Sequence, residues 1–231
     1  MSTPDDSVGD PRESADAKAA KQGWTFSDLH AWEVLRPLLD AGPYLPWSEG
    51  ALRPGAVVKI ANEIVLGRRH TVVELGSGIG TIVIARLLCE YGGELTSVEH
   101  EPSWARFVVE QIEREELTDN ARVLEAPLEA HAASLAGAPW YSEAALAGLP
   151  DAIEMLIVDG PPGYGEGMEL SRYPALPALR ERLAPGALVV LDDANRPGEQ
   201  QIVERWRAET GLEFGLMRSE GIAIAEVPGA A

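Results

Sequence analysis

The stretch at residues 71–88, TVVELGSGIGTIVIARLL, places the strongest constraint on the fold. A short apolar run that contains Glu74 leads into three alternating glycines, Gly76, Gly78 and Gly80, and then into an apolar pattern with helical spacing. Glycine permits positive φ and leaves room for a ligand against the backbone, while the start of a helix offers free N–H groups. The stretch therefore predicts a strand, a ligand-binding turn and a helix.

The same alternation of strand and helix continues along the chain. Apolar runs of strand length occur at 71–75, 95–99, 122–126, 154–159 and 187–192, and helical stretches lie between them near 80–91, 103–116, 170–184 and 197–210. Such alternation predicts right-handed βαβ units and an open, mostly parallel α/β sheet. The runs EFGLMRS and GIAIAEV near the C-terminal end predict a final hairpin.

The chain of 231 residues fits one globular domain preceded by two shorter segments. Residues 1–23 are small, polar and charged, and predict a disordered tail without the apolar stretch of a signal peptide. Residues 24–67 predict an N-terminal helical cap, and residues 68–231 the ligand-binding core. No uncharged apolar run reaches the 18 residues expected of a membrane span.

The composition argues for a small-molecule partner. The formal net charge is −18, and so acidic a surface repels nucleic acid and anionic membranes. The single cysteine, Cys89, rules out an internal disulfide, favours the cytoplasm, and is expected to be a small buried side chain on an apolar helix face. The sequence does not fix the oligomeric state, and a homodimer stays open.

The glycine spacing and Glu74 distinguish between two kinds of nucleotide ligand. A dinucleotide turn has the spacing G-x-G-x-x-G, whereas here the third glycine comes one residue early and Thr81 stands in its place. A carboxylate such as Glu74 is unfavourable beside a pyrophosphate but favourable beside an amino group or a sulfonium. Glu99, at the end of the second strand, can accept hydrogen bonds from ribose hydroxyls in either case.

The pattern E-x-G-x-G-x-G resembles the first motif of the class I S-adenosylmethionine (SAM)-dependent methyltransferases, and the resemblance covers residues 50–228. It implies a Rossmann-like fold with a seven-stranded, mostly parallel sheet of order 3-2-1-4-5-7-6. It also places residues 126–128 beside adenine. His100 directly follows Glu99, so its side chain is expected to point to the other face. The implied cofactor residues are Glu74, Gly76, Ser77, Gly78, Gly80, Thr81, Glu99, His100, Ala126, Pro127, Leu128 and Asp159.

Three aspartates follow the fourth and fifth predicted strands. Asp159 ends one strand, and Asp192 and Asp193 end the next, so that their carboxylates converge and repel unless they bind protons or a cation. This placement resembles the metal-dependent small-molecule O-methyltransferases of the catechol and macrolide-sugar types. It implies that the three bind Mg²⁺, which favours oxygen ligands. Capping of the helix near 197 by Asp193 or Asn195 is the competing interpretation.

The expected reaction is methyl transfer to a hydroxyl of a small molecule, with Asp159 beside the acceptor. His30, in the N-terminal helix, is a candidate general base. Arg172 receives no chemical role beyond pairing with nearby acids. Three alternatives stay open: a metal-free N- or C-methyltransferase, an NAD-type oxidoreductase, and a noncatalytic SAM-binding protein. The residues that could line an acceptor pocket are Tyr44, Trp47, Tyr164 and Tyr173.

Overall fold

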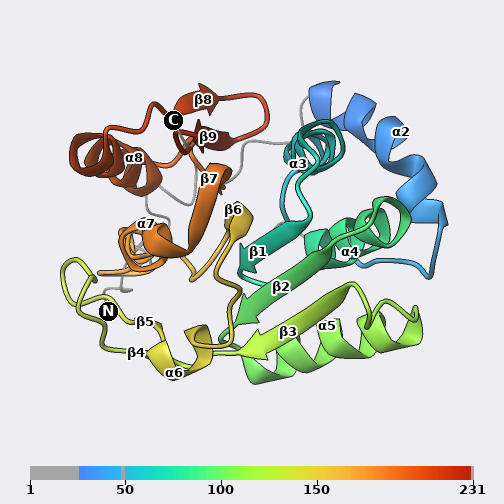
Figure 1. Ribbon diagram of the computed structural model, residues 1–231, viewed down its shortest axis with the longest axis horizontal. Helices are drawn as coiled ribbons and strands as arrows, with labels where there is room; N and C mark the ends of the chain where they lie inside the picture. Colours follow the sequence, from blue (N-terminus) through green and yellow to red (C-terminus); the bar gives the residue numbers. More distant parts are fainter. Residues whose placement is uncertain (1–25, 48–49, 230–231) are drawn as a thin grey trace, which may run out of the picture.

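The computed structural model describes residues 26–47 and 50–229, so the predicted tail at 1–23 lies outside the described residues. A seven-stranded sheet of order β3-β2-β1-β6-β7-β9-β8 forms the centre of the molecule (Figure 1). The strands are β1 (Thr71–Leu75), β2 (Glu94–Glu99), β3 (Ala121–Glu125), β6 (Ile153–Val158), β7 (Leu183–Leu191), β8 (Gly215–Met217) and β9 (Ile222–Glu226).

The predicted strand order is confirmed, because β4 (Leu128–Glu129) and β5 (Trp140–Tyr141) form a separate two-stranded hairpin. Strands β3, β2, β1, β6 and β7 run parallel, whereas β9 pairs antiparallel with both β7 and β8. Met217 pairs with Ile222 at the turn of the predicted C-terminal hairpin. The carboxyl ends of β1, β2 and β3 point toward the side where the β4–β5 hairpin lies (Figure 1).

Helices cover both faces of the sheet. Successive side chains of a strand point to opposite faces, so both faces carry apolar side chains that must be buried. In β1, Val72 packs into the core on one face and Val73 into the core on the other. The first face carries α2 (Phe26–Asp40), α3 (Pro54–Gly67), α4 (Ile79–Tyr91) and α5 (Pro102–Arg114). The second face carries α6 (Glu143–Leu146), α7 (Ala175–Leu179) and α8 (Pro197–Thr210).

A buried ion pair joins the two N-terminal helices. Asp28, fully buried in α2, accepts hydrogen bonds from the guanidinium of Arg53 and from the backbone N–H of Gly55 at the start of α3. Leu35 of α2 and Val57 of α3 enter the same apolar core as α4. In the described ranges, no helix has the length and apolar character needed to cross a membrane.

The predicted helix at 170–184 is wrong in its extent. Only α7 and the short 3₁₀ helix η1 (Arg180–Arg182) form there, and β7 already begins at Leu183. Pro174 and Pro177 restrict helix growth because proline lacks an N–H and fixes φ. The expectation for Cys89 is also wrong: it is exposed, because the last turn of α4 extends beyond the core.

Candidate active site

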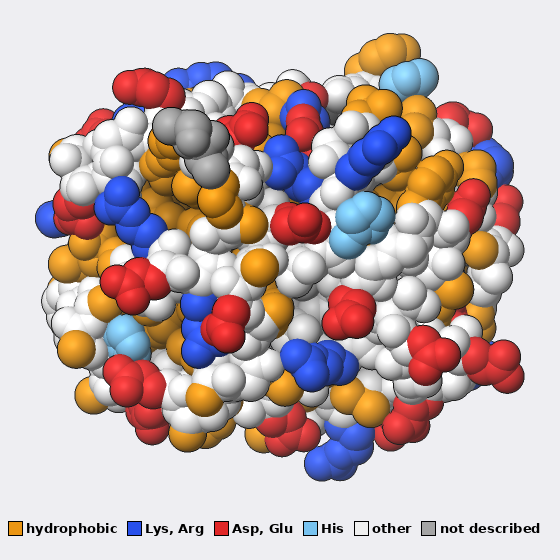
Figure 2. All heavy atoms as spheres, in the orientation of Figure 1, with side chains coloured by type: hydrophobic (Ala, Val, Ile, Leu, Met, Phe, Trp, Pro, Cys, Tyr) orange, Lys and Arg blue, Asp and Glu red, His pale blue; other side chains and the backbone are white. Residues whose placement is uncertain are grey.

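Two adjoining cavities, of about 200 and 340 Å³, open at the carboxyl ends of the central parallel strands. Both are lined by Ala51, Ser77, Trp104 and Asp159, so they form one continuous cleft. A ligand site at this edge is expected for an open α/β sheet. Acidic side chains are spread over the face of the molecule shown in Figure 2, in keeping with the net charge of −18.

The glycine turn after β1 is held against the end of β6. Gly76 has φ +94°, and a Cβ built on it would lie 3.0 Å from the carbonyl carbon and oxygen of Asp159. Its N–H donates to Val98 O at 2.8 Å. Glycine is therefore required at 76 both for its backbone conformation and for the close approach of a second strand.

Glu74 lies at the floor of the smaller cavity with one oxygen engaged. Its Oε2 accepts hydrogen bonds from Thr81 Oγ1 at 2.5 Å and Ser97 Oγ at 2.7 Å, and Thr81 Oγ1 in turn accepts from Gly78 N at 2.8 Å. Thr81 thus has a direct role where a dinucleotide site has glycine. Burial raises the pKa of Glu74 to about 7, against the two hydroxyl hydrogen bonds, which lower it.

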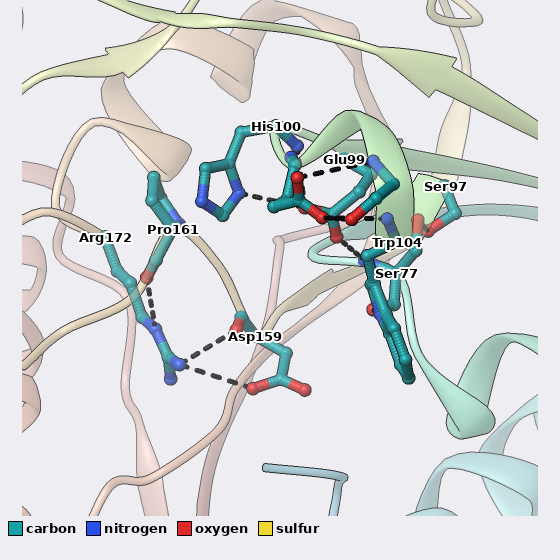
Figure 3. A network of polar contacts seen from close by, with 10 residues as sticks. Ser77, Ser97, Glu99, His100, Trp104, Asp159, Pro161 and Arg172 are labelled. Carbon is teal, nitrogen blue, oxygen red and sulfur yellow. Dashed lines mark hydrogen bonds and ion pairs between the residues drawn. The ribbon is translucent and has the colours of Figure 1, made fainter. Parts of the chain in front are cut away.

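Glu99 lines the larger cavity and binds the same turn from the other side (Figure 3). Its Oε2 accepts from Ser77 N at 2.9 Å, and its Oε1 accepts from the N–H groups of His100 and Glu101, both at 2.8 Å. A carboxylate has about four acceptor positions, so one remains for a ligand hydroxyl. Trp104 donates from Nε1 to Ser77 O at 2.7 Å, which fixes its ring beside the turn.

The ring of His100 lies closer to Glu99 than the sequence predicted. Its Nδ1 is 2.9 Å from Glu99 Oε1, and the residue lines the larger cavity rather than facing away from it. The reason is that β2 ends at Glu99. The alternation of side chains between the two faces of a strand therefore does not extend to residue 100.

The residues predicted to flank adenine lie beside the cleft but line neither cavity. Ala126 is buried and donates its N–H to Glu99 O at 2.7 Å. Pro127 is exposed, and Leu128 pairs with Tyr141 in the β4–β5 hairpin. Their role as adenine contacts stays a prediction.

The three predicted aspartates converge. One carboxylate oxygen from each of Asp159, Asp192 and Asp193 lies within 4.8 Å of the others. The competing interpretation, helix capping, is wrong: α8 has Arg196 at its N-cap and no side-chain capping bond. Asn195 instead donates to Arg218 O at 2.9 Å.

Arg172, to which the sequence assigned no chemistry, lies buried in the middle of this acid cluster. Its Nε donates to Pro161 O at 3.1 Å, and its Nη2 donates to Asp159 O at 2.8 Å and to Asp159 Oδ1 at 3.3 Å (Figure 3). Its Nη1 donates to Asp192 O at 3.2 Å and lies 3.1 Å from Asp193 Oδ2. Four hydrogen bonds and the ion pair with Asp193 thus hold the guanidinium among the strand ends.

The acid cluster carries more negative charge than its arginines neutralise. Glu199 joins the three aspartates around Arg172, and Arg196 is the other cation, 2.7 Å from Asp193 Oδ2. Burial is the main cause that raises the pKa of Asp192 and of Glu199 to about 7 each. Burial and the charge of Asp192 raise the pKa of Asp159 well above its usual range. Protons or a bound cation must balance the excess.

The other candidates are dispersed. His30 is exposed on α2 and lines neither cavity, so the structure does not bring it to the cleft. Of the predicted acceptor aromatics, only Tyr164 lines the cleft, where it is 73% exposed. Tyr173 instead donates to Glu209 at 2.6 Å, and Trp47 packs against Trp32 with ring centroids 4.7 Å apart.

Residues that the sequence did not single out complete the cleft. These are Arg172, Tyr141, Trp104, Arg196 and the segment at 50–51. Neither Tyr141 nor Trp104 belongs to a motif. Trp104 lies in the helix predicted near 103–116, whereas Tyr141 lies in a short hairpin that the sequence does not predict. Their positions follow from tertiary packing, so spacing along the chain gives no signal for them.

Comparison with known proteins agrees with this arrangement. The family described as "Methyltransferase domain" matches residues 73–194, a range that contains the glycine turn, Glu99 and the acid cluster. No curated protein matches the sequence.

Solved structures share the fold at low sequence identity. A methyltransferase of Podospora anserina bound to SAH (S-adenosylhomocysteine) is 14% identical, with a TM-score of 0.57, and the match covers 97% of this chain and 98% of that one. An O-methyltransferase of Bacillus cereus in complex with SAH is 18% identical, with a TM-score of 0.55 and coverage of 92% and 96%. A methyltransferase of Geobacter sulfurreducens is 12% identical, with a TM-score of 0.53 and coverage of 87% and 89%.

The family match leaves no place for the NAD-type oxidoreductase alternative. The E-x-G-x-G-x-G turn and the Rossmann-like sheet order agree with that match. The chain belongs to the methyltransferase-domain family and is a class I SAM-dependent methyltransferase.

Proposed function

We propose that this methyltransferase acts on a hydroxyl group of a small molecule, with a divalent cation held by Asp159, Asp192 and Asp193. The observation that carries the proposal is the position of Asp159, which lines both cavities and also belongs to the acid cluster. This shared residue supports a place for the cluster beside the methyl group of the cofactor. The O-methyltransferase of Bacillus cereus, with the same fold, supports the choice of a hydroxyl.

The donor set fits a hard cation. The cluster offers only carboxylate oxygens, within 4.8 Å of one another, and oxygen ligands favour Mg²⁺ over zinc. The negative charge left after Arg172 and Arg196 is a further argument for a cation. When bound, such a cation supplies a Lewis acid that attracts acceptor oxygens and lowers the pKa of a hydroxyl.

The chain's own residues account for the remaining roles. We assign Glu74 to the amino group of SAM and Glu99 to the ribose, each through the carboxylate oxygen position that the glycine turn leaves free. Trp104 and the segment at 50–51 line both cavities. Because the sulfonium is already activated, alignment and exclusion of water provide most of what the protein adds to an in-line transfer.

The test is SAH release from SAM with a panel of small acceptors that carry two adjacent hydroxyls, before and after treatment with excess chelator. We expect activity to fall by at least tenfold in chelator and to return with Mg²⁺. Activity that is fully retained in chelator would show that the two arginines and bound protons balance the charge of the cluster without a metal, and would favour metal-free O-, N- or C-methylation. SAH binding without turnover on any acceptor would favour the noncatalytic alternative.

A further inference from the structure

Tyr141 is a buried side chain at the edge of the cleft that no motif accounts for. It lies in β5 of the small hairpin, is fully buried, and lines the larger cavity. Its ring packs against Trp140 with centroids 5.6 Å apart and lies 6.4 Å from that of His100. Its hydroxyl oxygen has no hydrogen-bond partner among the described residues.

The hydroxyl lies where the glycine turn meets the end of β6. A Cβ built on Gly160 would lie 2.3 Å from Tyr141 Oη and 2.9 Å from the Cα of Gly76. The hydroxyl is therefore next to backbone that lines the larger cavity together with Glu99 and Asp159. The charges of Glu99 and Asp159 act on it from either side, and that of Arg172 opposes them.

A buried hydroxyl without a partner is unfavourable, since folding removes its hydrogen bonds to water and returns none. In a native protein such a group at a cavity wall is expected to have its partner in the ligand. Its burial and the neighbouring carboxylates raise the pKa of Tyr141 well above its usual value, so the phenol keeps its proton and remains a donor.

We propose that Tyr141 is a cofactor-binding residue whose hydroxyl donates a hydrogen bond to the nucleoside part of SAM. The nucleoside is the part expected there, because Gly76, Glu99 and His100 surround the same wall of the larger cavity. The hairpin adds a second argument, since Tyr141 pairs with Leu128 in the segment predicted to flank adenine. The inference rests on SAM being the cofactor, which binding of SAH to the unaltered protein tests separately.

The test compares Tyr141→Phe with the unaltered protein by calorimetric titration with SAH and with 5′-methylthioadenosine, which keeps the nucleoside and lacks the amino acid. We expect affinity for both ligands to fall about tenfold, equivalent to about 1.4 kcal/mol, with the KM of the acceptor unchanged. The melting temperature of the ligand-free variant is expected to stay the same or rise, because the unpaired hydroxyl is removed.

Tyr91→Phe is the matched control, because Tyr91, at the end of α4, is about half exposed and lines neither cavity. It is expected to leave the affinity for both nucleosides unchanged. Unchanged affinity in Tyr141→Phe would overturn the proposal, as would a lower melting temperature of its ligand-free form, which would reveal a structural partner for the hydroxyl. A change in acceptor KM alone would move the contact to the acceptor and overturn it as well. If the unaltered protein does not bind SAH, the cofactor assignment itself fails.

Discussion

Arg172 Nη2 donates to both the backbone oxygen and the side-chain Oδ1 of Asp159, at 2.8 and 3.3 Å. The same guanidinium also contacts the loop at Pro161 and the end of β7 at Asp192 and Asp193. A single buried side chain thus fixes the spacing of the two strand ends that carry the acid cluster. We infer that Arg172 is a positioning residue that acts through the aspartates.

Replacing Arg172 with methionine is therefore expected to be severe. It leaves Asp159 and Asp193 without their buried cation, and breaking a buried ion pair typically costs about 3–5 kcal/mol. We expect the free energy of unfolding in urea to fall by about that amount and turnover to be lost. Arg172→Lys is expected to recover part of the stability but little activity, because lysine lacks the planar set of donors.

The control for this change is Arg36→Met on the surface of α2. Arg36 forms an ion pair with Glu33, and both side chains are more than half exposed. Such a pair contributes about 0–1 kcal/mol, so both stability and activity should remain close to those of the unaltered protein. Equal effects of the two substitutions would contradict the positioning role of Arg172.

Metal binding can be measured without turnover. If the acid cluster binds Mg²⁺, the ion at about 100 times its dissociation constant should stabilise the protein by about 2.7 kcal/mol, and so raise the melting temperature by roughly 5–10 °C. Asp193→Asn should remove most of this shift. Asparagine suits the position, because Asp193 has φ +58° and asparagine tolerates the left-handed region.

Asp151→Asn is the matched control, since the Asp151 side chain is 94% exposed and lies outside the acid cluster. It should leave the Mg²⁺-dependent shift intact. A shift of the same size in Asp193→Asn would show that the ion binds elsewhere.

The sheet and half of the site could be predicted because they depend on local patterns. Apolar runs with the right spacing set the strands, and the carboxyl ends of parallel strands meet at one edge, so Asp159 and Asp192 had to converge. The glycine turn likewise needs only neighbouring residues to place Glu74 and Gly76.

The other half of the site depends on contacts between segments that are far apart in the sequence. Arg172 lies in a turn before the short helix α7, where it reaches Asp192 O, whereas the sequence predicts a helix at this position. Tyr141 enters the cleft through a two-residue strand too short to give a pattern. His30 looked suitable as a base by its chemistry alone, but the packing of α2 leaves it exposed.

The raised pKa of Glu74, about 7, makes cofactor binding depend on pH. In the ligand-free protein Glu74 is mostly protonated below pH 7, whereas an amino group of the ligand requires the ionised form. We expect the affinity for SAH to fall as pH decreases below 7, by up to tenfold per unit, and to level off above it. Calorimetric titration in buffers of different ionisation enthalpy should show proton release near pH 7.

Glu74→Gln separates this effect from other titrations. The variant is expected to bind SAH at least tenfold more weakly at pH 8 and to lose the pH dependence below pH 7. In the unaltered protein the folded-state pKa lies above the usual 4.5, so Glu74 costs stability as pH rises from about 4.5 to about 7, by about 3 kcal/mol in total. Glu74→Gln should therefore melt higher than the unaltered protein at pH 8; an unchanged pH profile of SAH affinity would contradict the assignment.

The last prediction concerns Gly76 and compares it with Gly92, which also has positive φ. Gly92, with φ +82° and ψ 144°, has no atom within 4 Å of a built Cβ, so Gly92→Ala costs only the backbone strain of about 1–3 kcal/mol. Gly76→Ala adds a contact of 3.0 Å between the new Cβ and the backbone of Asp159. Because both groups are fixed by the backbone, no change of side-chain rotamer can relieve this contact. We expect Gly76→Ala to lose more stability than Gly92→Ala and to abolish SAH binding, which urea unfolding and titration with SAH will measure. Equal losses with SAH binding intact in both variants would mean that the turn does not need its close approach to β6 to hold the cofactor.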